Sequence, residues 1–161
     1  MSFLDRSAGR RSPLLPWSGG IVSHLVAITL SALVQSQLFA RSILVVDDDQ
    51  DIREWMGAVF LEAGYNVAFA SDGAEALLEL SRGHFDVVVT DIVMPNRDGF
   101  ELIGALRESW PEIRIIVVSG DGRGAREGYL QTALGLGAHS ALSKPFGVTK
   151  LRAAVVSVLN F

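Results

Sequence analysis

With 161 residues, of which 20% are charged and 49% hydrophobic, the chain has the composition of a globular domain with a core and not of a disordered segment. It contains no cysteine, which excludes disulfide scaffolds, thiolate zinc sites and cysteine nucleophiles. The net charge of -4 is unevenly distributed, because residues 1–41 carry +3 and residues 42–161 carry -7. An acidic body of this kind argues against nucleic acid as a direct partner.

Residues 1–41 are predicted to form an N-terminal extension to a domain that spans residues 42–161. No residue from Ser12 to Ala40 is formally charged. Serine, threonine, glutamine and histidine nevertheless occur too often in this stretch for a good membrane-spanning helix. Three interpretations stay open: a non-functional extension or wrongly assigned start, a helix that contacts a membrane surface or a partner through residues 12–40, and an export signal.

From Ser42 onward, short apolar runs alternate with stretches of helical period. Continuous apolar runs of about five residues are typical of strands that are buried on both faces of a parallel sheet. The predicted strands are Ser42–Val46, Asn66–Ala70, Asp86–Thr90, Arg114–Val118 and Ser140–Leu142. The prediction of the last strand is weak when taken alone, because this run has three residues and Leu142 is its only large apolar side chain.

Helical stretches follow each of these runs. Apolar residues recur at helical spacing before Gly64, before Gly83 and before Pro111, and these residues are well placed to end helices. The stretch 124–137 is less regular, and Val148–Leu159 closes the chain. Five strand–helix units predict an α/β fold, a doubly wound five-stranded parallel sheet with helices on both faces and right-handed crossovers.

Polar residues gather at the predicted carboxyl ends of the strands. In chain order they are Asp47, Asp48 and Asp49, then Asp91, Ser119 and Lys144. In open α/β sheets, ligands bind beyond the carboxyl ends of the strands, near the point where the strand order reverses. If the first and third strands are neighbours there, the acidic residues face one crevice, with Ser119 and Lys144 on its other side.

Three segments carry a family resemblance. Ile43–Arg53, Asp86–Phe100 and Ser143–Phe146 resemble, in order and spacing, the motifs of the receiver domains of two-component response regulators. The resemblance extends over about Arg41 to Phe161. It implies the flavodoxin-like strand order 2-1-3-4-5.

The resemblance also implies a role for each polar residue. Asp91 corresponds to the phosphoacceptor. Asp47 and Asp48 correspond to the acidic pair that holds Mg²⁺, together with Asp91 and the backbone carbonyl of Val93. Ser119 corresponds to the hydroxyl that bonds the phosphoryl group, and Lys144 to the lysine that pairs with it.

Physical chemistry gives these roles an independent reason. A carboxylate is a weak nucleophile towards an anionic phosphoryl donor, so positive charge must offset the repulsion. Mg²⁺ prefers a few carboxylates and waters as ligands, which neighbouring strand ends supply. Lys144 adds a compact positive charge. A phosphoryl group on Asp91 would make the charge there more negative, at roughly -1.5 to -2. The hydroxyl of Ser119 would donate a hydrogen bond to the phosphoryl group.

The implied function is that of a stand-alone phosphoacceptor in two-component signalling, located in the cytoplasm and without a separate catalytic domain. The phosphoryl donor would be a histidine kinase or a histidine phosphotransfer protein. A downstream protein would bind the face formed by residues 124–137, 140–142 and 148–159. Two alternatives stay open: an interaction module that works without phosphorylation, and the receiver fragment of a hybrid histidine kinase.

Other acidic residues near the strand ends have structural interpretations. Asp49 or Asp51 and Asp72 are predicted helix N-caps, and Asp98–Gly99 is predicted to make the turn into the third helix. The run Asp47–Asp51 lacks the glycine and the glutamate that a calcium loop needs at its sixth and twelfth positions. It is therefore not a calcium loop.

One position departs from the family pattern. Receivers often carry a tyrosine or phenylalanine on the fifth strand, three residues before the lysine, and Ala141 stands there. The usual aromatic readout is therefore not expected, and an output change would have to travel through movement of a loop or of the fourth predicted helix, in the stretch 124–137. The segment Gly120–Ala125 also matches a dinucleotide fingerprint, but it follows the fourth strand and not the first.

Overall fold

The computed structural model describes residues 40–96, 98–120 and 126–160, together with Val26. The compact unit that contains the sheet begins at Ala40. Most of the predicted extension lies outside the described residues, so the boundary at residue 41 and the three interpretations of residues 12–40 stay predictions. Within the described parts of the chain, no helix is both long enough and apolar enough to cross a membrane.

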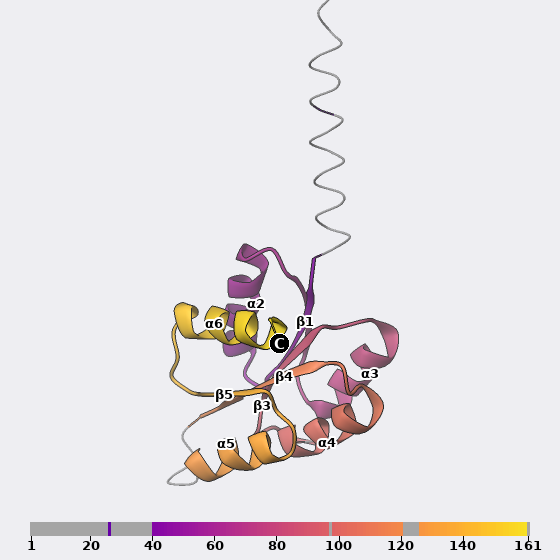
Figure 1. The fold of residues 1–161 in the computed structure, drawn as a ribbon, viewed down its shortest axis with the longest axis vertical. Helices are drawn as coiled ribbons and strands as arrows, with labels where there is room; N and C mark the ends of the chain where they lie inside the picture. The colour runs from indigo at the N-terminus through magenta and orange to yellow at the C-terminus, as the bar shows by residue number, and fades with distance from the viewer. Residues whose placement is uncertain (1–25, 27–39, 97, 121–125, 161) are drawn as a thin grey trace, which may run out of the picture. The chain divides into compact units, whose positions relative to one another are not determined.

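Five strands alternate with five helices in the described unit (Figure 1). The strands are β1 (Ser42–Val46), β2 (Asn66–Ala70), β3 (Val87–Asp91), β4 (Arg114–Ser119) and β5 (Ser140–Ser143). The helices are α2 (Gln50–Glu62), α3 (Gly73–Arg82), α4 (Gly99–Ser109), α5 (Arg126–Gly135) and α6 (Val148–Leu159).

The sheet has the order β2-β1-β3-β4-β5 and all its pairs are parallel, which confirms the predicted fold. The strand bounds differ slightly from the prediction. β3 begins at Val87 instead of Asp86 and ends at Asp91, while β4 ends at Ser119 and β5 at Ser143. Asp91 and Ser119 are therefore the last residues of their strands and not the first residues after them, because the neighbouring strands continue the ladder by one position.

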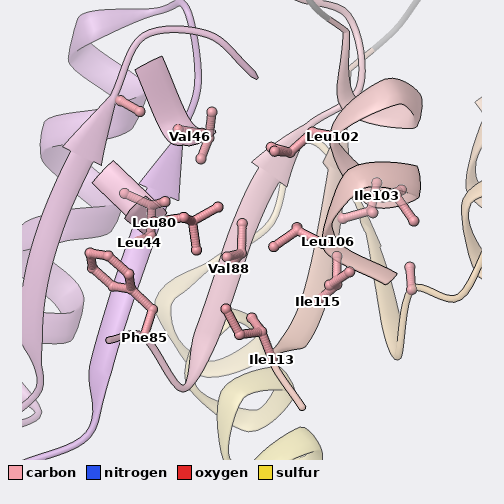
Figure 2. Packing of buried hydrophobic residues seen from close by; sticks show 14 of the residues in the cluster. Leu44, Val46, Leu80, Phe85, Val88, Leu102, Ile103, Leu106, Ile113 and Ile115 are labelled. Carbon is pink, nitrogen blue, oxygen red and sulfur yellow. The ribbon is translucent and has the colours of Figure 1, made fainter. Parts of the chain in front are cut away.

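Side chains alternate between the two faces of the sheet and fill a core on each side. On one face, Leu44, Val88 and Ile115 pack against α3 and α4 (Figure 2). Ala133 of α5 belongs to the same core. On the other face, strand residues such as Val45 and Val89 pack against α2 and α6. This is the period of two expected of a strand. Because both faces are covered, consecutive residues in the middle of the inner strands are apolar.

The edge strands are less buried than the central ones. Every residue of β3 is buried, whereas every residue of β5 is only half-buried. An edge strand has one neighbour and is only partly covered by helices. The weak apolar pattern of Ser140–Leu142 has this physical origin.

Three aspartates begin helices, as predicted. The carboxylate of Asp49 accepts hydrogen bonds from the amides of Asp51 and Ile52, so Asp49 is the N-cap of α2 and Asp51 lies in its first turn. Asp72 caps α3 and Asp98 caps α4 in the same way. Because helices leave the carboxyl ends of the strands, these caps place helix N-termini around the candidate site.

His139 makes one pH-dependent contact at the edge of the sheet. Its Nδ1 accepts the amide of Ile115 at 3.1 Å, which requires a neutral ring nitrogen. Burial lowers the pKa of His139, and the nearby charges of Arg107 and Arg114 lower it further. The ordinary pKa of histidine in an unfolded chain is about 6.5. Between this value and the lowered pKa of the folded state, His139 therefore binds more protons in the unfolded chain than in the folded one.

We expect neutral His139 and its bond from the Ile115 amide to contribute to the free energy of unfolding. This contribution should be fully present above about pH 6.5 and should be lost as the pH falls below that value. Its size should be under about 1 kcal/mol, because the imidazole is only partly buried and solvent screens its charge. The variant His139→Asn keeps an acceptor that does not titrate, so its urea midpoint should fall less than that of the wild type between about pH 7.5 and pH 5.5. Equal pH dependence of the two proteins would contradict this assignment.

Candidate functional site

Three carboxylates meet at the carboxyl ends of β1 and β3. Asp47, Asp48 and Asp91 each offer an oxygen atom that lies within 4.8 Å of the other two. The sheet register explains their proximity, because Val46 at the end of β1 pairs with Thr90 in β3 and the acids follow directly. Asp47 is fully buried and Asp91 almost so, whereas Asp48 is exposed. The predicted acidic cluster is therefore present in the fold.

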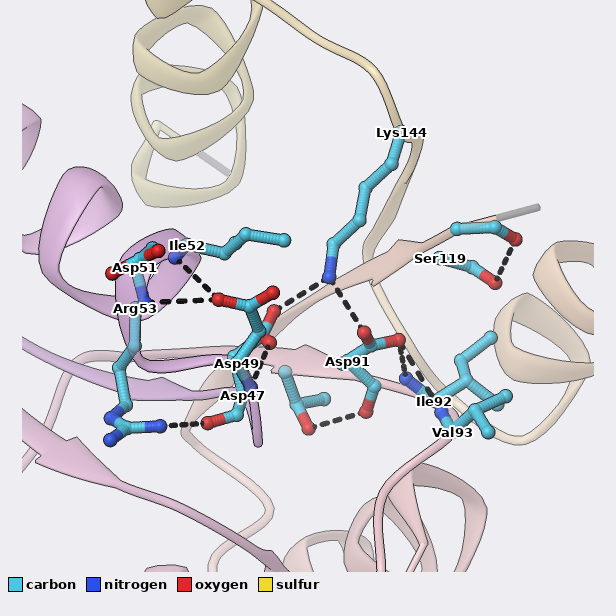
Figure 3. A network of polar contacts seen from close by, with 12 residues as sticks. Asp47, Asp49, Asp51, Ile52, Arg53, Asp91, Ile92, Val93, Ser119 and Lys144 are labelled. Atoms are coloured by element: carbon cyan, nitrogen blue, oxygen red, sulfur yellow. Dashed lines mark hydrogen bonds and ion pairs between the residues drawn. The ribbon is translucent and has the colours of Figure 1, made fainter. Parts of the chain in front are cut away.

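Lys144 joins two of these carboxylates (Figure 3). Its Nζ donates to Asp47 Oδ2 at 2.7 Å and to Asp91 Oδ2 at 2.6 Å. Burial by itself would lower the pKa of Lys144, but the hydrogen bonds to the two aspartates outweigh it and hold that pKa above its ordinary value. The side chain is therefore an ammonium ion, and it offsets part of the negative charge of the cluster.

Asp47 is fully buried, which disfavours the charged form of its carboxylate. Burial raises the pKa of Asp47, and the nearby charge of Asp91 adds to the effect, although hydrogen bonding to Lys144 acts against it. A divalent cation would favour the ionised form of such a group. The donor set, three carboxylates within reach of one another, fits the hard oxygen ligands that Mg²⁺ prefers.

The backbone after β3 holds the carboxylate of Asp91 in place. Asp91 Oδ1 accepts the amide of Ile92 at 2.6 Å and that of Val93 at 3.3 Å. Together with the bond from Lys144, these contacts hold both carboxylate oxygens. Val93 is 64% exposed, and its backbone amide makes the contact with Asp91. The predicted metal contact of the Val93 carbonyl stays a prediction.

Ser119 lies at the end of β4, next to Asp91. Asp91 pairs with Val118 in the sheet, so Ser119 is one residue further along the adjacent strand. Its side chain is buried, and its Oγ donates to the carbonyl of Gly120 at 3.4 Å. Ser119 also pairs with Ser143, which precedes Lys144. The fold therefore brings the predicted site residues together at the carboxyl ends of the strands, and Figure 3 shows Asp47, Asp91, Ser119 and Lys144 there.

Gly99 lies directly against the backbone of Asp91 and Ile92, and the sequence alone does not predict this close approach. A Cβ atom on this residue would lie 2.3 Å from the carbonyl oxygen of Asp91 and 2.8 Å from the Cα of Ile92. The amide of Gly99 donates to the carbonyl of Ile92 at 2.8 Å. Helix α4 thus begins directly against the backbone of Asp91. The Asp98–Gly99 pair predicts a turn, but this close approach depends on how α4 packs.

Two further side chains brace the loops around the cluster. Arg53 Nη1 donates to the carbonyl of Asp47. Asn96, which has a positive φ of 63°, donates from Nδ2 to Asp72 Oδ2 at 2.7 Å. The loop after β3 is therefore tied to the N-cap of α3. No motif in the sequence pairs Asn96 with Asp72, because the two residues meet only through the order of the strands.

The aromatic side chains near the site are not on β5. Ala141 occupies the predicted reporter position and pairs with Val117. Phe100 of α4 and Tyr129 of α5 instead form an edge-to-face pair with ring centroids 5.8 Å apart.

Beside Lys144, an open groove of about 440 Å³ is lined by Ile52, Trp55, Lys144, Pro145 and Phe146. The Lys144–Pro145 peptide bond is cis.

Comparison with known proteins agrees with this geometry. The family model of the response regulator receiver domain matches residues 43–156. The chain belongs to this family. Receiver domains of response regulators take part in two-component signalling, in which they interact with histidine kinases or phosphotransfer proteins.

The curated relatives of this receiver domain are longer than the chain. The response regulator MprA of Mycobacterium leprae (strain TN) is 36% identical over 120 residues, which cover 73% of this chain and 50% of MprA. MprA of Mycobacterium sp. (strain KMS) is 37% identical over the same shares of the two chains. The chain therefore spans about half the length of the curated relatives it matches, and the predicted stand-alone arrangement stays a prediction.

Solved structures show the same receiver fold. The chemotaxis response regulator CheY4 of Vibrio cholerae aligns with a TM-score of 0.65 and 30% identity, over 74% of this chain and 98% of CheY4. The receiver domain of NtrX from Brucella abortus aligns with a TM-score of 0.69 and 28% identity, over 73% of this chain and 98% of that one. Both alignments cover nearly the whole of the solved chain.

Proposed function

We propose that this receiver domain accepts a phosphoryl group on Asp91 in a Mg²⁺-dependent reaction, and that the modification switches the binding of a protein partner. The observation that carries the proposal is the position of the Asp91 carboxylate. It is buried, has two acidic neighbours and is bonded by the ammonium group of Lys144. The neighbours Asp47 and Lys144 have perturbed pKa values, and perturbed ionisable groups at a sheet's switch point are typical of a reactive site.

Mg²⁺ would be held by the carboxylates of Asp47, Asp48 and Asp91 and by the backbone carbonyl of Val93. Bound there, the ion would supply the positive charge that offsets repulsion between a carboxylate and the phosphoryl oxygens. Exposed Asp48 would keep one side of the site open to solvent, in keeping with the tendency of Mg²⁺ to retain several waters.

In the proposed step, an oxygen of Asp91 forms a bond to phosphorus while the bond between phosphorus and the donor's leaving group breaks, with its electron pair going to that group. Lys144 already bonds Asp91 and lies within reach of the incoming oxygens. The hydroxyl of Ser119 makes a long bond to Gly120 at 3.4 Å. Such a bond is weak, so the hydroxyl can turn towards a phosphoryl oxygen.

A histidine kinase or histidine phosphotransfer protein in the cytoplasm is the proposed donor. The proposed output surface is the face formed by α5, β5 and α6, where Tyr129, Leu134 and Val156 are exposed apolar side chains. Because Ala141 has no ring to rotate, the change at Asp91 would reach this face through displacement of α5. The Phe100–Tyr129 contact links α5 to α4, which starts against Asp91.

Incubation with a small-molecule phosphodonor tests this function. We expect the intact mass of the purified chain to increase by one phosphoryl group in the presence of Mg²⁺. Removal of divalent ions with EDTA should slow the uptake at least ~100-fold, because the carboxylates would then repel the donor. Equal uptake with EDTA would contradict the metal requirement. A complete lack of uptake would favour the interaction module that works without phosphorylation.

A further inference from the structure

Arg53 contacts the acidic cluster through its backbone and has no part in the proposed chemistry. We propose that Arg53 is a positioning residue, which holds the turn from Asp47 to Asp48 in the geometry that binds the metal ion. This inference rests on the proposed function, because it concerns the same site. It is carried by the hydrogen bonds of Asp47 and Asp49, on either side of Asp48, and by the bond from the Arg53 guanidinium to the carbonyl of Asp47.

The turn after β1 is held by hydrogen bonds at several points. The amide of Asp47 donates to the carbonyl of Ala70 at 3.2 Å, and Asp47 Oδ1 accepts the amide of Asp49 at 3.0 Å. Arg53, in the first turns of α2, donates from Nη1 to the carbonyl of Asp47 (Figure 3). Its own amide donates to the carbonyl of Asp49 at 3.0 Å. Arg53 thus bonds the carbonyl of Asp47 through its side chain and the carbonyl of Asp49 through its backbone amide, on either side of Asp48.

The carbonyl of Asp47 belongs to the peptide group that joins Asp47 to Asp48. Because a peptide group is planar, fixing this carbonyl also fixes the direction in which the chain enters Asp48. Asp48 is exposed, so surrounding side chains restrain it little, and its orientation depends on that peptide. A planar guanidinium can reach the carbonyl and hold it in a defined direction, which a flexible ammonium does less well.

The charge of Arg53 also acts on Glu75, in the first turn of α3. Hydrogen bonds from Ser71 are the main reason that the pKa of Glu75 is lowered, and the positive charge of Arg53 contributes to the same shift. Arg53 therefore lies near enough to Glu75 for the two charges to interact, while its Nη1 donates to the carbonyl of Asp47.

The two effects of this guanidinium on a bound cation have opposite signs. As a positive charge near the cluster, Arg53 would weaken the binding of Mg²⁺, so its removal would tighten binding. As a positioning residue, it keeps two ligands in place, so its removal weakens binding. Partners that orient metal ligands typically change metal affinity 10- to 100-fold when they are replaced. The direction of the change therefore distinguishes the two roles.

The test compares Arg53→Gln and Arg53→Lys with the control Arg152→Gln. Arg152 is matched because its Nη2 also donates to a backbone carbonyl of α2, that of Val59 at 3.3 Å. Mg²⁺ titrations would be followed by tryptophan fluorescence. We expect the Kd of Arg53→Gln to rise roughly 10-fold and that of Arg53→Lys to rise by less, with Arg152→Gln within about 2-fold of the wild type. An unchanged or lower Kd in Arg53→Gln overturns the proposal.

Amide hydrogen exchange without metal provides an independent readout. We expect exchange at the amide of Asp49, which donates to Asp47 Oδ1, to be roughly 10-fold faster in Arg53→Gln than in the wild type, because the turn opens more often. Arg152→Gln should leave this amide unchanged. If the wild type neither binds Mg²⁺ nor accepts a phosphoryl group, the proposed function fails. Exchange still decides whether Arg53 holds the turn, and unchanged rates in Arg53→Gln overturn that role.

Discussion

Replacement of Asp91 by asparagine is expected to reduce phosphoryl uptake at least ~1000-fold. The amide is nearly the same size as the carboxylate, and its oxygen can still accept the amide of Ile92, which bonds Asp91 Oδ1 at 2.6 Å. It has no anionic oxygen to attack phosphorus, and it replaces the carboxylate that accepts a bond from Lys144 Nζ at 2.6 Å. Intact-mass measurements after incubation with Mg²⁺ and a small-molecule phosphodonor would show the loss.

Asp98→Asn is the matched control for this variant. Asp98 is a nearby aspartate that caps α4 through the amide of Glu101 at 2.9 Å, and asparagine caps helices about as well as aspartate does. We expect its uptake to equal that of the wild type. Uptake that survives in Asp91→Asn would assign the phosphoryl group to another side chain, with exposed Asp48 as the first candidate.

Gly99→Ala is expected to lower the free energy of unfolding by about 3 kcal/mol. The new Cβ would lie 2.3 Å from the carbonyl oxygen of Asp91 and 2.8 Å from the Cα of Ile92. Both are backbone atoms of the segment that carries the carboxylate, so no side-chain rotation relieves the clash. Either α4 or the end of β3 must move. The displacement should therefore slow phosphoryl uptake as well as destabilise the fold.

The same substitution in the same helix provides the control. Gly104 also lies in α4, and a Cβ added there would meet no other atom within 4 Å. Gly104→Ala should therefore stabilise the protein by roughly 0.5–1 kcal/mol, since alanine favours the helical state. Urea denaturation of both variants would measure the difference. Similar midpoints for Gly99→Ala and the wild type would show that α4 can be displaced at little cost.

Local sequence patterns determined the elements and their type. Continuous apolar runs indicated strands buried on both faces, and the two cores on opposite sides of the sheet confirm this. The exact ends were not determined in this way. Asp91 and Ser119 close their strands because the adjacent strands continue the ladder, and no local pattern contains that information.

The convergence of the polar residues was also predictable from the sequence. In a parallel sheet all strands point the same way, so side chains that follow different strands meet at one edge. Asp47, Asp91 and Lys144 could therefore be grouped before their distances were known. The strand order came from the family resemblance, and the sheet confirms it.

The contacts within the site were decided by the tertiary structure alone. Lys144 bonds Asp47 and Asp91, although it lies 97 and 53 residues away from them in the chain. The approach of Gly99 to the backbone of Asp91 depends on the packing of α4 against the sheet. The bond from Arg53 to the Asp47 carbonyl depends on the angle at which α2 leaves β1. Distances through space follow from strand order and helix packing, whereas local sequence determines only which element each residue joins and at which end.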